Sequence, residues 1–501
     1  MDLEELIKRS AAYPIVTDDV QEMCTGGIFV FGGDRPKVKQ DLIIALDAGA
    51  SFVVTDEELE LVPPSMQVFS PDLRRTAAKF ARAFYGNPGM NMTIVGITGT
   101  SGKTTSAYLV ESIFKAAGYK TGAIGTSFIR YGDKTQSSLN TTPGAFNLNR
   151  ALAAMTETGC AAVVLEVSSH GILRDRTFGV PFDGALFTNL SREHLDEHGT
   201  MEAYYDTKRR LFTQYAAYSR DCGKSPKAAV NFDCSYGRQL LKDLAVSMAP
   251  GGAHSVGFSL RESRQDYDGT RLELGPDGIR GAVIENCTPK KTEMSVASPL
   301  IGEFNAQNIL GVVALLRQLD LKPEVIERGL TETRSIPGRM TYIDTQKGIA
   351  VYVDFAHKPG ALNAALSTLR MITKRRLICV FGCGGFGDPG KRSIMGRIAA
   401  IYSDIVIVTA DNSRGEPFEA IAADIVRDIT PGEVELFVVD DRKQAIRQAL
   451  VAARSGDVIL IAGRGAEESL EVYSEQTGPT VIEFDDRVIA ARLAAEVLTD
   501  N

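Results

Sequence analysis

The chain has 501 residues, of which 44% are hydrophobic and 24% are charged, and its formal net charge at pH 7 is −8. This composition excludes a largely disordered chain, because it supplies enough apolar material for several cores. The acidic excess argues against nucleic acid as a partner, since binding to a phosphate backbone relies on clustered lysine and arginine. A chain of this length is expected to form about three domains.

Neither end of the chain nor its middle carries a membrane-type segment. The acidic stretch Met1–Glu5 lacks the apolar core of a signal peptide, and no run of about 18 apolar residues occurs. Seven cysteines, an odd number scattered along the chain, are typical of reduced thiols rather than of a disulfide framework. We therefore expect a cytoplasmic protein, acting as a monomer, that contacts neither membrane nor nucleic acid.

The first ninety residues have the pattern of a small α/β domain. Short apolar runs at 28–31 and 51–54 are strand-like, and a helical pattern lies between them at 39–48. A cluster of turn-forming residues follows at 85–89. We place a domain boundary there and expect an N-terminal α/β domain over residues 1–90.

The strongest motif of the chain follows this boundary. Gly-Ile-Thr-Gly-Thr-Ser-Gly-Lys-Thr-Thr occupies 96–105, between the apolar run 92–95 and a helical pattern that continues to Ala116. In such a loop backbone N–H groups point at phosphate oxygens, the lysine adds a positive charge, and a threonine hydroxyl reaches a magnesium ion. The strict spacing would require glycine at Ile97, so this is a variant loop. We expect a nucleotide's phosphates at Gly99, Thr100, Ser101, Gly102, Lys103, Thr104 and Thr105.

Strand-like runs alternate with helical patterns through the rest of the chain, which is typical of parallel sheets covered on both faces. Runs at 161–165 and 184–187 belong to the central region, and the turn-forming stretch 335–339 ends it. We expect a central domain with a P-loop ATPase-like parallel sheet over 91–337 and a C-terminal Rossmann-like domain over 338–501. The C-terminal domain has five strand candidates, at 349–353, 377–381, 405–409, 436–439 and 458–462.

Polar side chains follow the apolar runs of the central domain, where the carboxyl ends of parallel strands would gather them. Glu166 follows one run and is itself followed by His170. Mg²⁺ prefers oxygen ligands and takes few from protein, so Thr104, Glu166 and nucleotide phosphates would form a sensible shell. The alternative is that Glu166 only caps a helix. A second polar stretch, 188–199, follows the next run and could supply another metal site.

Five segments occur in the order seen in the Mur ligases: Thr98–Thr105, Glu166–His170, Asn189–Asp196, Gly338–Met340 and Asp354–His357. The chain therefore resembles the Mur ligase family, and within it the ligases that add a diamino acid to the peptidoglycan precursor. The resemblance covers about residues 90–490. It implies an ATP-dependent amide ligase that makes an acyl phosphate on a carboxylate acceptor, on which the amine of an amino acid then acts.

The resemblance assigns roles residue by residue. It implies that Lys103 and Thr104 hold phosphates and a first magnesium, with Glu166 and His194 as metal ligands. Lys208 matches the lysine that becomes carbamylated in this family, which would support a second magnesium as an anion; by local pattern alone it would be a surface helix lysine. The catalytic set so implied is Lys103, Glu166, His194 and Lys208. The nucleotide-facing positions further along the chain are Asn305, Asn308, Arg339, Asp354 and His357.

The resemblance also implies two substrate sites. For the muramyl-peptide acceptor the matching positions are Thr141, Thr142, Ser168 and Arg176. For the incoming amino acid they are Arg392, Asn412, Arg414, Gly463 and Glu467. Arg414 favours an amino acid with a distal carboxylate, and thus diaminopimelate over lysine, because arginine pairs bidentately with carboxylates. The expected cofactors are ATP and Mg²⁺.

Several segments depart from the family pattern. Ser413 stands where the diaminopimelate motif has proline, and Gly463–Glu467 reads Gly-Arg-Gly-Ala-Glu in place of Gly-Lys-Gly-His-Glu. In the N-terminal domain 19–21 and 25–30 lack the arginine and the polar residues that help hold uridine diphosphate. The main hypothesis is diaminopimelate addition to UDP-N-acetylmuramoyl-L-alanyl-D-glutamate. The alternatives are the same chemistry on a non-UDP or non-muramyl carboxylate, and a non-catalytic nucleotide-dependent binding partner.

Overall fold

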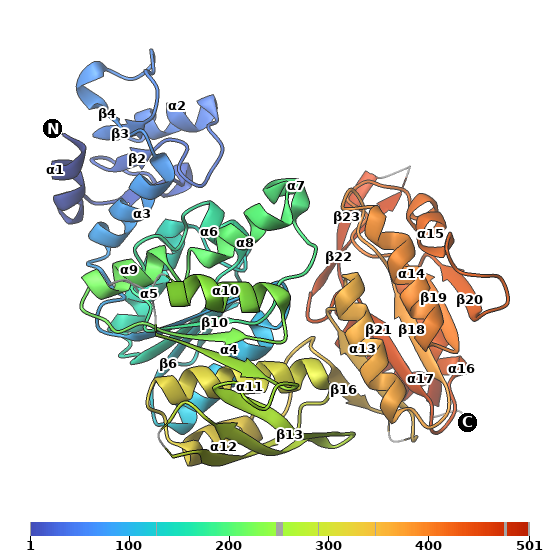
Figure 1. Ribbon diagram of the computed structural model, residues 1–501. Coiled ribbons are helices and arrows are strands. Elements are labelled where there is room, and N and C mark those ends of the chain that lie inside the picture. Colours follow the sequence, from blue (N-terminus) through green and yellow to red (C-terminus); the bar gives the residue numbers. More distant parts are fainter. Residues whose placement is uncertain are drawn as a thin grey trace. The chain divides into compact units, whose positions relative to one another are not determined.

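The computed structural model describes residues 2–126, 128–246, 254–288, 290–345, 347–474 and 478–498 (Figure 1). The chain divides into two compact units. The first contains the chain up to Leu272 together with Gly281–Val296 and Gln307–Glu332. The second contains Glu273–Arg280, Ala297–Ala306 and the chain from Thr333 onward. The expected boundaries of three domains, at 1–90, 91–337 and 338–501, stay a prediction.

The amino end of the first unit is a four-stranded parallel sheet in the order β1-β2-β3-β4. Leu6, Val30 and Phe80 belong to the apolar core between this sheet and α1 and α3. The elements are α1 (Leu3–Lys8), β1 (Val16–Thr17), β2 (Ile28–Val30), α2 (Lys39–Asp47), β3 (Phe52–Thr55), β4 (Gln67–Phe69) and α3 (Leu73–Phe84), with 3₁₀ turns at Ser10–Ala12, Val20–Glu22 and Pro64–Met66.

The rest of the first unit is built on an eleven-stranded sheet in the order β15-β14-β13-β12-β11-β10-β5-β9-β6-β7-β8. Its centre, β11-β10-β5-β9-β6, is parallel. The strands are β5 (Thr93–Thr98), β6 (Thr121–Gly125), β7 (Phe128–Tyr131), β8 (Lys134–Gln136), β9 (Ala162–Glu166), β10 (Gly184–Phe187), β11 (Lys227–Asn231), β12 (His254–Ser259), β13 (Tyr267–Gly275), β14 (Gly278–Glu285) and β15 (Thr292–Ser298).

Helices cover both faces of this sheet. Helices α5, α8, α9 and α10 contribute to the apolar core on one face, and α4, which packs on β9 and α12, covers the other. The helices are α4 (Lys103–Ala116), α5 (Ala145–Glu157), α6 (Ser169–Leu173), α7 (Leu195–His198), α8 (Met201–Arg209), α9 (Gln214–Asp221), α10 (Ser235–Val246), α11 (Glu303–Gln318) and α12 (Pro323–Glu332).

The second unit contains a six-stranded sheet in the order β16-β17-β21-β18-β19-β20, parallel except for the edge strand β16, and a separate hairpin of β22 and β23. Helices α13, α14 and α15 pack on one face and α16 and α17 on the other. The strands are β16 (Thr341–Asp344), β17 (Ala350–Asp354), β18 (Leu377–Phe381), β19 (Ile405–Thr409), β20 (Glu435–Val439), β21 (Val458–Ala462), β22 (Ser469–Ser474) and β23 (Gly478–Glu483). The helices are α13 (Pro359–Ile372), α14 (Gly390–Tyr402), α15 (Phe418–Val426), α16 (Arg442–Ala452) and α17 (Asp486–Leu498).

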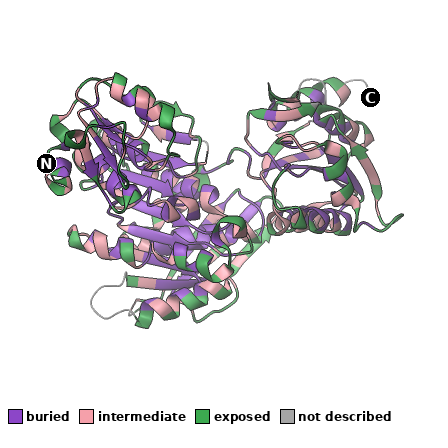
Figure 2. Ribbon diagram, turned by 90° about the horizontal axis from the view of Figure 1, so that it is seen from above, coloured by how far each residue is buried: buried purple, intermediate pink, exposed green. Residues whose placement is uncertain are grey.

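Burial follows the parallel strands. Strands β9, β10, β18, β19 and β21 are buried along their whole length (Figure 2). This is the pattern of strands covered on both faces, which read as continuous apolar runs. The expected α/β architecture is confirmed, and the five strand candidates of the C-terminal region coincide with β17 to β21. No helix in the described ranges is long and apolar enough to span a membrane.

Candidate active site

The phosphate loop joins β5 to α4 at the centre of the eleven-stranded sheet. Gly102 caps α4 in the left-handed region with φ of 89°, and a Cβ there would lie 2.3 Å from Asn308 Oδ1. Gly99 has φ of 152°, and its Cβ would lie 1.9 Å from Thr188 Oγ1. Only glycine fits at these two positions, because both the backbone angle and the neighbouring atoms exclude a side chain. The loop therefore turns directly into the helix N-terminus, where backbone N–H groups attract anions.

A second loop, which follows β10, fixes the shape of the phosphate loop. Asn189 receives a hydrogen bond on its side-chain Oδ1 from the Ser101 N–H at 2.9 Å and another on its carbonyl from the Thr100 N–H at 2.9 Å. Thr188 donates its hydroxyl to the Ser101 carbonyl at 2.6 Å. The two loops are neighbours because β5 and β10 pair in parallel. The loop after β10 thus contacts the phosphate loop through neutral groups.

Two lysines meet at one carbonyl oxygen of this loop. Lys103 Nζ donates to the Gly99 carbonyl at 2.9 Å and to the Thr100 carbonyl at 3.1 Å. Lys208 Nζ donates to the same Gly99 oxygen at 3.1 Å and lies 4.9 Å from the centre of the Tyr204 ring. Lys208 is only 1% exposed, so the surface position that its local pattern suggests is wrong. Two positively charged side chains thus converge on one carbonyl oxygen of the phosphate loop.

Glu166 ends β9 and is fully buried. Its Oε2 accepts the hydroxyls of Thr104 and Thr126, each at 3.1 Å, and its Oε1 accepts the Thr126 N–H at 3.1 Å. A helix-capping role does not describe this arrangement, because the carboxylate links the start of α4 to the loop after β6. The arrangement brings the two expected oxygen ligands, Thr104 and Glu166, into contact.

Three histidines gather beside this site. The His170 ring lies 4.6 Å from that of His194 and 6.1 Å from that of His198, between ring centres. His170 Nε2 is 3.0 Å from Glu197 Oε2. Burial lowers the pKa of His170 below its usual value, and burial together with the nearby His170 and Lys208 lowers the pKa of His198. Burial therefore favours the neutral form of the His170 and His198 imidazoles.

The expected acceptor residues form a connected group at the ends of β9 and α6. Thr142 is fully buried, and its hydroxyl donates to the Glu166 carbonyl at 2.8 Å and accepts the Ser168 N–H at 2.9 Å. Ser168 caps α6 through its side chain. Arg176 donates to the Thr142 carbonyl at 2.9 Å. Thr142 holds this group together, and of its partners Ser168 is half-buried while Arg176 is buried at 6% exposure.

Two further residues extend the acceptor group on either side. Thr141 Oγ1 lies 3.1 Å from Thr126 Oγ1, and Thr126 in turn donates to Glu166, so Thr141 connects the acceptor group to the expected metal ligand. Arg176 Nε lies 2.9 Å from Asp34 Oδ2, a residue of the amino-terminal sheet region. The arginine expected to bind substrate is therefore also paired with the domain expected to hold the other end of the acceptor.

The nucleotide-facing residues expected from later segments fall on both units. Asn308 lies on α11 beside Gly102, as described above. Asn305 lies about one turn earlier on the same helix, and its side chain donates to the Ile301 carbonyl at 2.8 Å. Within the second unit, Asp354 ends β17 and accepts the Met340 N–H at 2.7 Å. Burial raises the pKa of Asp354, which the nearby Arg339 opposes.

His357 lies in the loop that follows β17. Its Nδ1 is 2.7 Å from the Phe355 carbonyl, and the Arg339 guanidinium lies 4.6 Å from the centre of the Phe355 ring. Desolvation, with Lys358 and Lys391 nearby, holds the pKa of His357 well below its usual value. Arg339, Asp354 and His357 are thus grouped on neighbouring loops of the second unit.

The expected amino-acid residues lie at the carboxyl ends of β19 and β21. Asn412 Nδ2 is 3.4 Å from Glu467 Oε2, and Gly463 directly follows β21. Arg414 is exposed and has φ of 49°, a left-handed conformation that is costly for a residue with a side chain. Burial raises the pKa of Glu467 above its usual value. Amide, guanidinium and carboxyl groups are here on two adjacent loops, a combination suited to a zwitterionic ligand.

Arg392 differs from the other members of this set. It is 3% exposed, and its guanidinium pairs with both carboxylate oxygens of Glu416 at 2.7 Å and with Asp424 at 3.0 Å. The hydrogen bond from Arg392 lowers the pKa of Glu416. In this structure Arg392 therefore braces the loop that carries Arg414, and its expected contact with substrate stays a prediction.

Comparison with known proteins decides the family. A model of the Mur ligase middle domain matches residues 97–316, and a model described as Mur ligase, glutamate ligase domain, matches residues 338–465. The UDP-N-acetylmuramoyl-L-alanyl-D-glutamate--2,6-diaminopimelate ligase of Geobacter metallireducens is 38% identical over 486 residues, covering 94% of this chain and 91% of its own. The enzyme of that name from Synechococcus elongatus is 39% identical over 459 residues, covering 90% and 88%. The chain belongs to the Mur ligase family.

Solved structures agree with this membership. A ligase with the same printed name superimposes with a TM-score of 0.68 at 28% identity and covers 97% of this chain and 95% of its own. MurF of Thermotoga maritima in complex with ADP gives a TM-score of 0.62 at 17% identity, over 98% of each chain, and shows the shared fold. As a Mur ligase the chain is an ATP-dependent enzyme that joins a carboxylate to an amine. The expectation of this enzyme class from the five ordered segments is confirmed.

The sequence motifs of this Mur ligase did not indicate several residues that form hydrogen bonds with the expected site residues. Asn189 and Thr188 shape the phosphate loop, and Thr126 donates twice to Glu166. Asn189 lies inside a segment that carries the family resemblance, so its place directly after an apolar strand is the pattern that could have found it. Thr126 has no such motif, because its role depends on the pairing of β6 with β9.

Other candidate features of the chain lie outside this site. Cys379 and Cys383 are buried in and just after β18, and burial raises the pKa of the Cys383 thiol to about 12. No cluster of three or more His, Cys, Asp or Glu able to hold a metal occurs within the described residues. The two cysteines are therefore core residues, as expected for a buried strand end.

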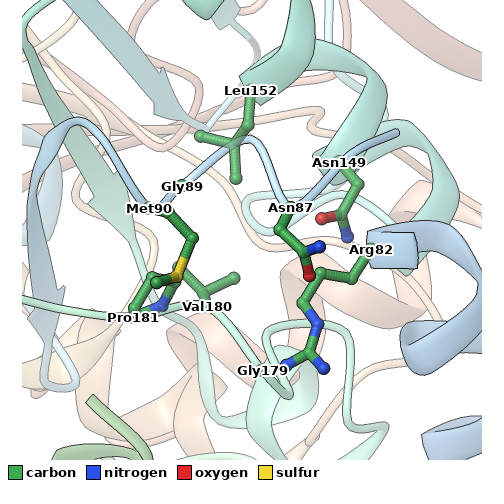
Figure 3. A pocket seen from close by; sticks show the side chains of 9 residues that line it. All are labelled: Arg82, Asn87, Gly89, Met90, Asn149, Leu152, Gly179, Val180 and Pro181. Atoms are coloured by element: carbon green, nitrogen blue, oxygen red, sulfur yellow. The ribbon is translucent and has the colours of Figure 1, made fainter. Parts of the chain in front are cut away.

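A separate small pocket, with a volume of about 10 Å³, lies in the first unit between α3, α5 and the loop before β10. Figure 3 shows the polar ends of Asn87 and Asn149 on one side of it and Met90, Val180 and Pro181 on the other. Its lining residues are Arg82, Asn87, Gly89, Met90, Asn149, Leu152, Gly179, Val180 and Pro181. None of the expected site residues lines it.

Proposed function

We propose that this Mur ligase couples diaminopimelate to UDP-N-acetylmuramoyl-L-alanyl-D-glutamate at the expense of ATP, as a step of peptidoglycan precursor synthesis. The observation that carries the proposal is the loop of Asn412 and Arg414. Arg414 is exposed, and Asn412 Nδ2 lies 3.4 Å from Glu467 Oε2. A guanidinium and an amide suit a distal carboxylate, and a carboxylate suits the amine beside it. The two relatives at 38% and 39% identity are named as ligases for these same substrates.

In the first step the acceptor carboxylate attacks the γ-phosphorus of ATP, which forms an acyl phosphate and releases ADP. The phosphate loop would bind the β- and γ-phosphates through its N–H groups, with Lys103 leaving the Gly99 carbonyl to pair with them. Positive charge and N–H dipoles aimed at the transferred group are what this step needs, because little covalent work falls to the protein. Ser168 and Arg176 would orient the acceptor.

Mg²⁺ fits the residues present. Glu166 is a buried carboxylate in contact with the Thr104 hydroxyl, and this pair offers the hard oxygen donors that Mg²⁺ takes in small number beside phosphates. Thr104, Glu166 and His194 would hold the ion, which when bound neutralises charge between nucleotide and acceptor. A fully buried carboxylate that accepts hydrogen bonds from neutral groups is strongly stabilised by a bound cation.

Lys208 would serve as a carbamate. Its ammonium is buried and shares the Gly99 oxygen with Lys103, so the two positive charges oppose each other. Reaction of its neutral amine with carbon dioxide forms an N–C bond and releases a proton, which turns a cation into an anion. That anion relieves the repulsion and can support a second magnesium ion.

In the second step the free amine of the amino acid attacks the acyl carbon, and the tetrahedral intermediate releases phosphate to leave an amide. Asn412, Arg414 and Glu467 would bind the far end of the amino acid so that its reacting amine is placed. A Cβ at Gly463 would lie 2.9 Å from Asp411 Oδ2, so glycine at this position leaves room for the Asp411 carboxylate. Arg392 would brace the loop of Arg414 through Glu416. We further propose that the enzyme works as a monomer in the cytoplasm, which light scattering and cell fractionation would test.

The test combines purified protein, ATP, Mg²⁺, the UDP-muramyl dipeptide and diaminopimelate. We expect phosphate release matched by an amide product whose mass equals both substrates less one water, with lysine a poor replacement. ATP turnover without product from any muramyl dipeptide would overturn the proposed acceptor. Thermal stabilisation by ATP but not by uridine nucleotides would point to a non-UDP carboxylate, the alternative that the altered segments 19–21 and 25–30 raise.

A further inference from the structure

We propose that Arg464 is a positioning residue of the amino-acid pocket, which fixes the orientation of the Asn412 amide so that its N–H groups face the ligand. This inference deepens the proposed function and rests on it for the identity of the ligand. The residues that carry it all belong to the second unit.

Arg464 is buried at the centre of a network of acceptors. It is 1% exposed, and its Nη1 donates to Asp411 Oδ1 and to Asn412 Oδ1, each at 3.1 Å. Its Nη2 donates to the Ser469 carbonyl and lies 3.3 Å from Glu467 Oε2. One planar guanidinium thus links the loop after β19 to the loop after β21 and to the start of β22.

The orientation of the Asn412 amide follows from these donors. Its Oδ1 receives Arg464 Nη1 and the Glu471 N–H, the second at 2.9 Å. Neither group can accept a hydrogen bond, so turning the amide over would place its NH₂ against two donors. The oxygen must therefore point inward. The NH₂ group points to the other side, where Glu467 Oε2 lies at 3.4 Å.

The neighbouring residue reinforces this placement. Ser413 donates its N–H to the Glu471 carbonyl at 3.1 Å, so residues 412 and 413 both bond to the backbone of Glu471. Arg414 follows on the same loop and is exposed. The contacts of Arg464 and Glu471 thus fix the loop of Asn412 and Arg414 beside the loop of Glu467.

The Asn412 amide, the Arg414 guanidinium and the Glu467 carboxylate define the ligand class. An amide N–H and a guanidinium bind a carboxylate, and Glu467 binds an ammonium group close to it. The ligand end that fits is one carbon bearing both groups, as at the distal end of a diamino dicarboxylic acid. Arg464 also opposes the effect of burial on Glu467 and so helps to keep that carboxylate charged.

The main test is Arg464→Met, which keeps the length of the side chain but removes the donors to Asp411, Asn412 and Ser469. We expect the KM for diaminopimelate to rise about 10- to 100-fold, the loss of one charge-assisted contact, with the KM for ATP unchanged and kcat within about threefold. Arg464→Lys restores the lysine of the family pattern and is the conservative variant, which should keep the KM within about threefold because its ammonium can still donate to the Asn412 oxygen. The control is Arg376→Met, since Arg376 pairs with Asp457 at 2.6 Å at the amino ends of β18 and β21. That variant should lose stability but keep the KM for diaminopimelate.

A double-mutant cycle asks whether Arg464 acts through the amide. In the Asn412→Ala background Arg464→Met should raise the KM little further, because the group that it positions is gone. An unchanged KM in Arg464→Met, or full additivity in the cycle, would overturn the inference. A wild-type protein that makes no product with diaminopimelate would instead overturn the proposed function, and the cycle is then run with the amino acid that it does couple.

A measurement without turnover completes the test. The side-chain NH₂ resonances of Asn412, identified by their loss in Asn412→Ala, report the orientation of the amide directly. We expect one well-dispersed pair in the wild-type protein and a shifted or exchange-broadened pair in Arg464→Met. A pair that is identical in both proteins would overturn the positioning role, whatever the enzyme's substrate.

Discussion

In the first unit the loop after β10 holds the phosphate loop through neutral groups, whereas in the second unit the amino-acid pocket is held by buried arginines. Asn189 and Thr188 fasten the loop through an amide, a carbonyl and a hydroxyl. In the second unit Arg392, Arg442 and Arg464 are each at most 3% exposed, and each pairs with at least one carboxylate.

This difference follows from the chemical groups that each site must present to its ligand. At the phosphate loop the lysines Lys103 and Lys208 contact backbone carbonyl oxygens, whereas the contacts from the loop after β10 carry no net charge. A pocket for a zwitterion needs charges of both signs at fixed places, and buried ion pairs with several hydrogen bonds give such fixed geometry at a cost in desolvation. The first site should therefore respond to mutation in turnover and the second in substrate affinity.

The largest effect is expected at Glu166. Glu166→Gln keeps the shape but puts an NH₂ group where Thr104 and Thr126 donate, and it removes the anion that the magnesium site requires. We expect kcat to fall roughly 10³-fold while the melting temperature changes little. Steady-state ADP release with a thermal melt of each protein would measure both. Turnover within tenfold of wild type would remove Glu166 from the catalytic site.

Lys208→Ala should come next. Loss of the carbamate is expected to lower turnover roughly 10²-fold, the size found when a group that supports a metal ligand is removed. Formate or acetate should restore part of the activity by placing a carboxylate where the carbamate stood. The matched control is Lys224→Ala, because Lys224 is a second mostly buried lysine of this unit that pairs with Asp183 at 2.6 Å. Rescue of both variants by acetate, or full activity of Lys208→Ala, would contradict the carbamate.

A smaller and different effect is expected at Arg414. Arg414→Ala should raise the KM for diaminopimelate about tenfold, because one exposed charge-assisted contact to a carboxylate is lost, and should leave kcat nearly unchanged. Arg447→Ala, which removes another exposed arginine of the same unit, serves as control. If Arg414→Ala lowered kcat and left the KM as it was, the contrast between the two sites would fail.

The smallest effect on activity is expected at Asp457, at the amino ends of the strands. Burial raises the pKa of Asp457, but hydrogen bonds from the Arg376 side chain and from backbone N–H groups outweigh it, so the net pKa is lowered. A lowered pKa means stability that is complete above the unfolded value and is lost as pH falls through the folded value. Asp457→Asn should therefore cost about 1 to 3 kcal/mol at pH 7. Denaturant unfolding of the wild-type protein and the variant should give the same difference in unfolding free energy at pH 5.5 as at pH 7. The difference should become smaller only below about pH 4.

The predictable parts of this molecule are those whose chemistry lies within one stretch of chain. The phosphate loop, with the helix from Lys103 to Ala116, and strands β17 to β21 follow from local patterns. Lys208 does not, because on its own helix it looks like a surface lysine and only the packing of α8 against the loop buries it.

The pocket of the second unit was the hardest part to foresee for the same reason. Arg464 is 53 residues from Asp411, and Glu471, which orients Asn412, lies on β22, a hairpin strand that the sequence patterns did not indicate. Pairings over such distances depend on which loops the sheet brings together. Local periodicity carries no information about them.

The carbonyl of Gly99, which both Lys103 and Lys208 contact, has a thermodynamic consequence. When phosphates draw Lys103 away, and when carbon dioxide turns Lys208 into an anion, the same crowding of charge is relieved. Two events that relieve the same repulsion between positive charges are thermodynamically coupled, and each changes the free energy of the other by the same amount. We therefore expect dissolved carbon dioxide to alter the affinity for ATP, and ATP to alter the uptake of carbon dioxide by the same factor, so that the supply of inorganic carbon tunes the enzyme.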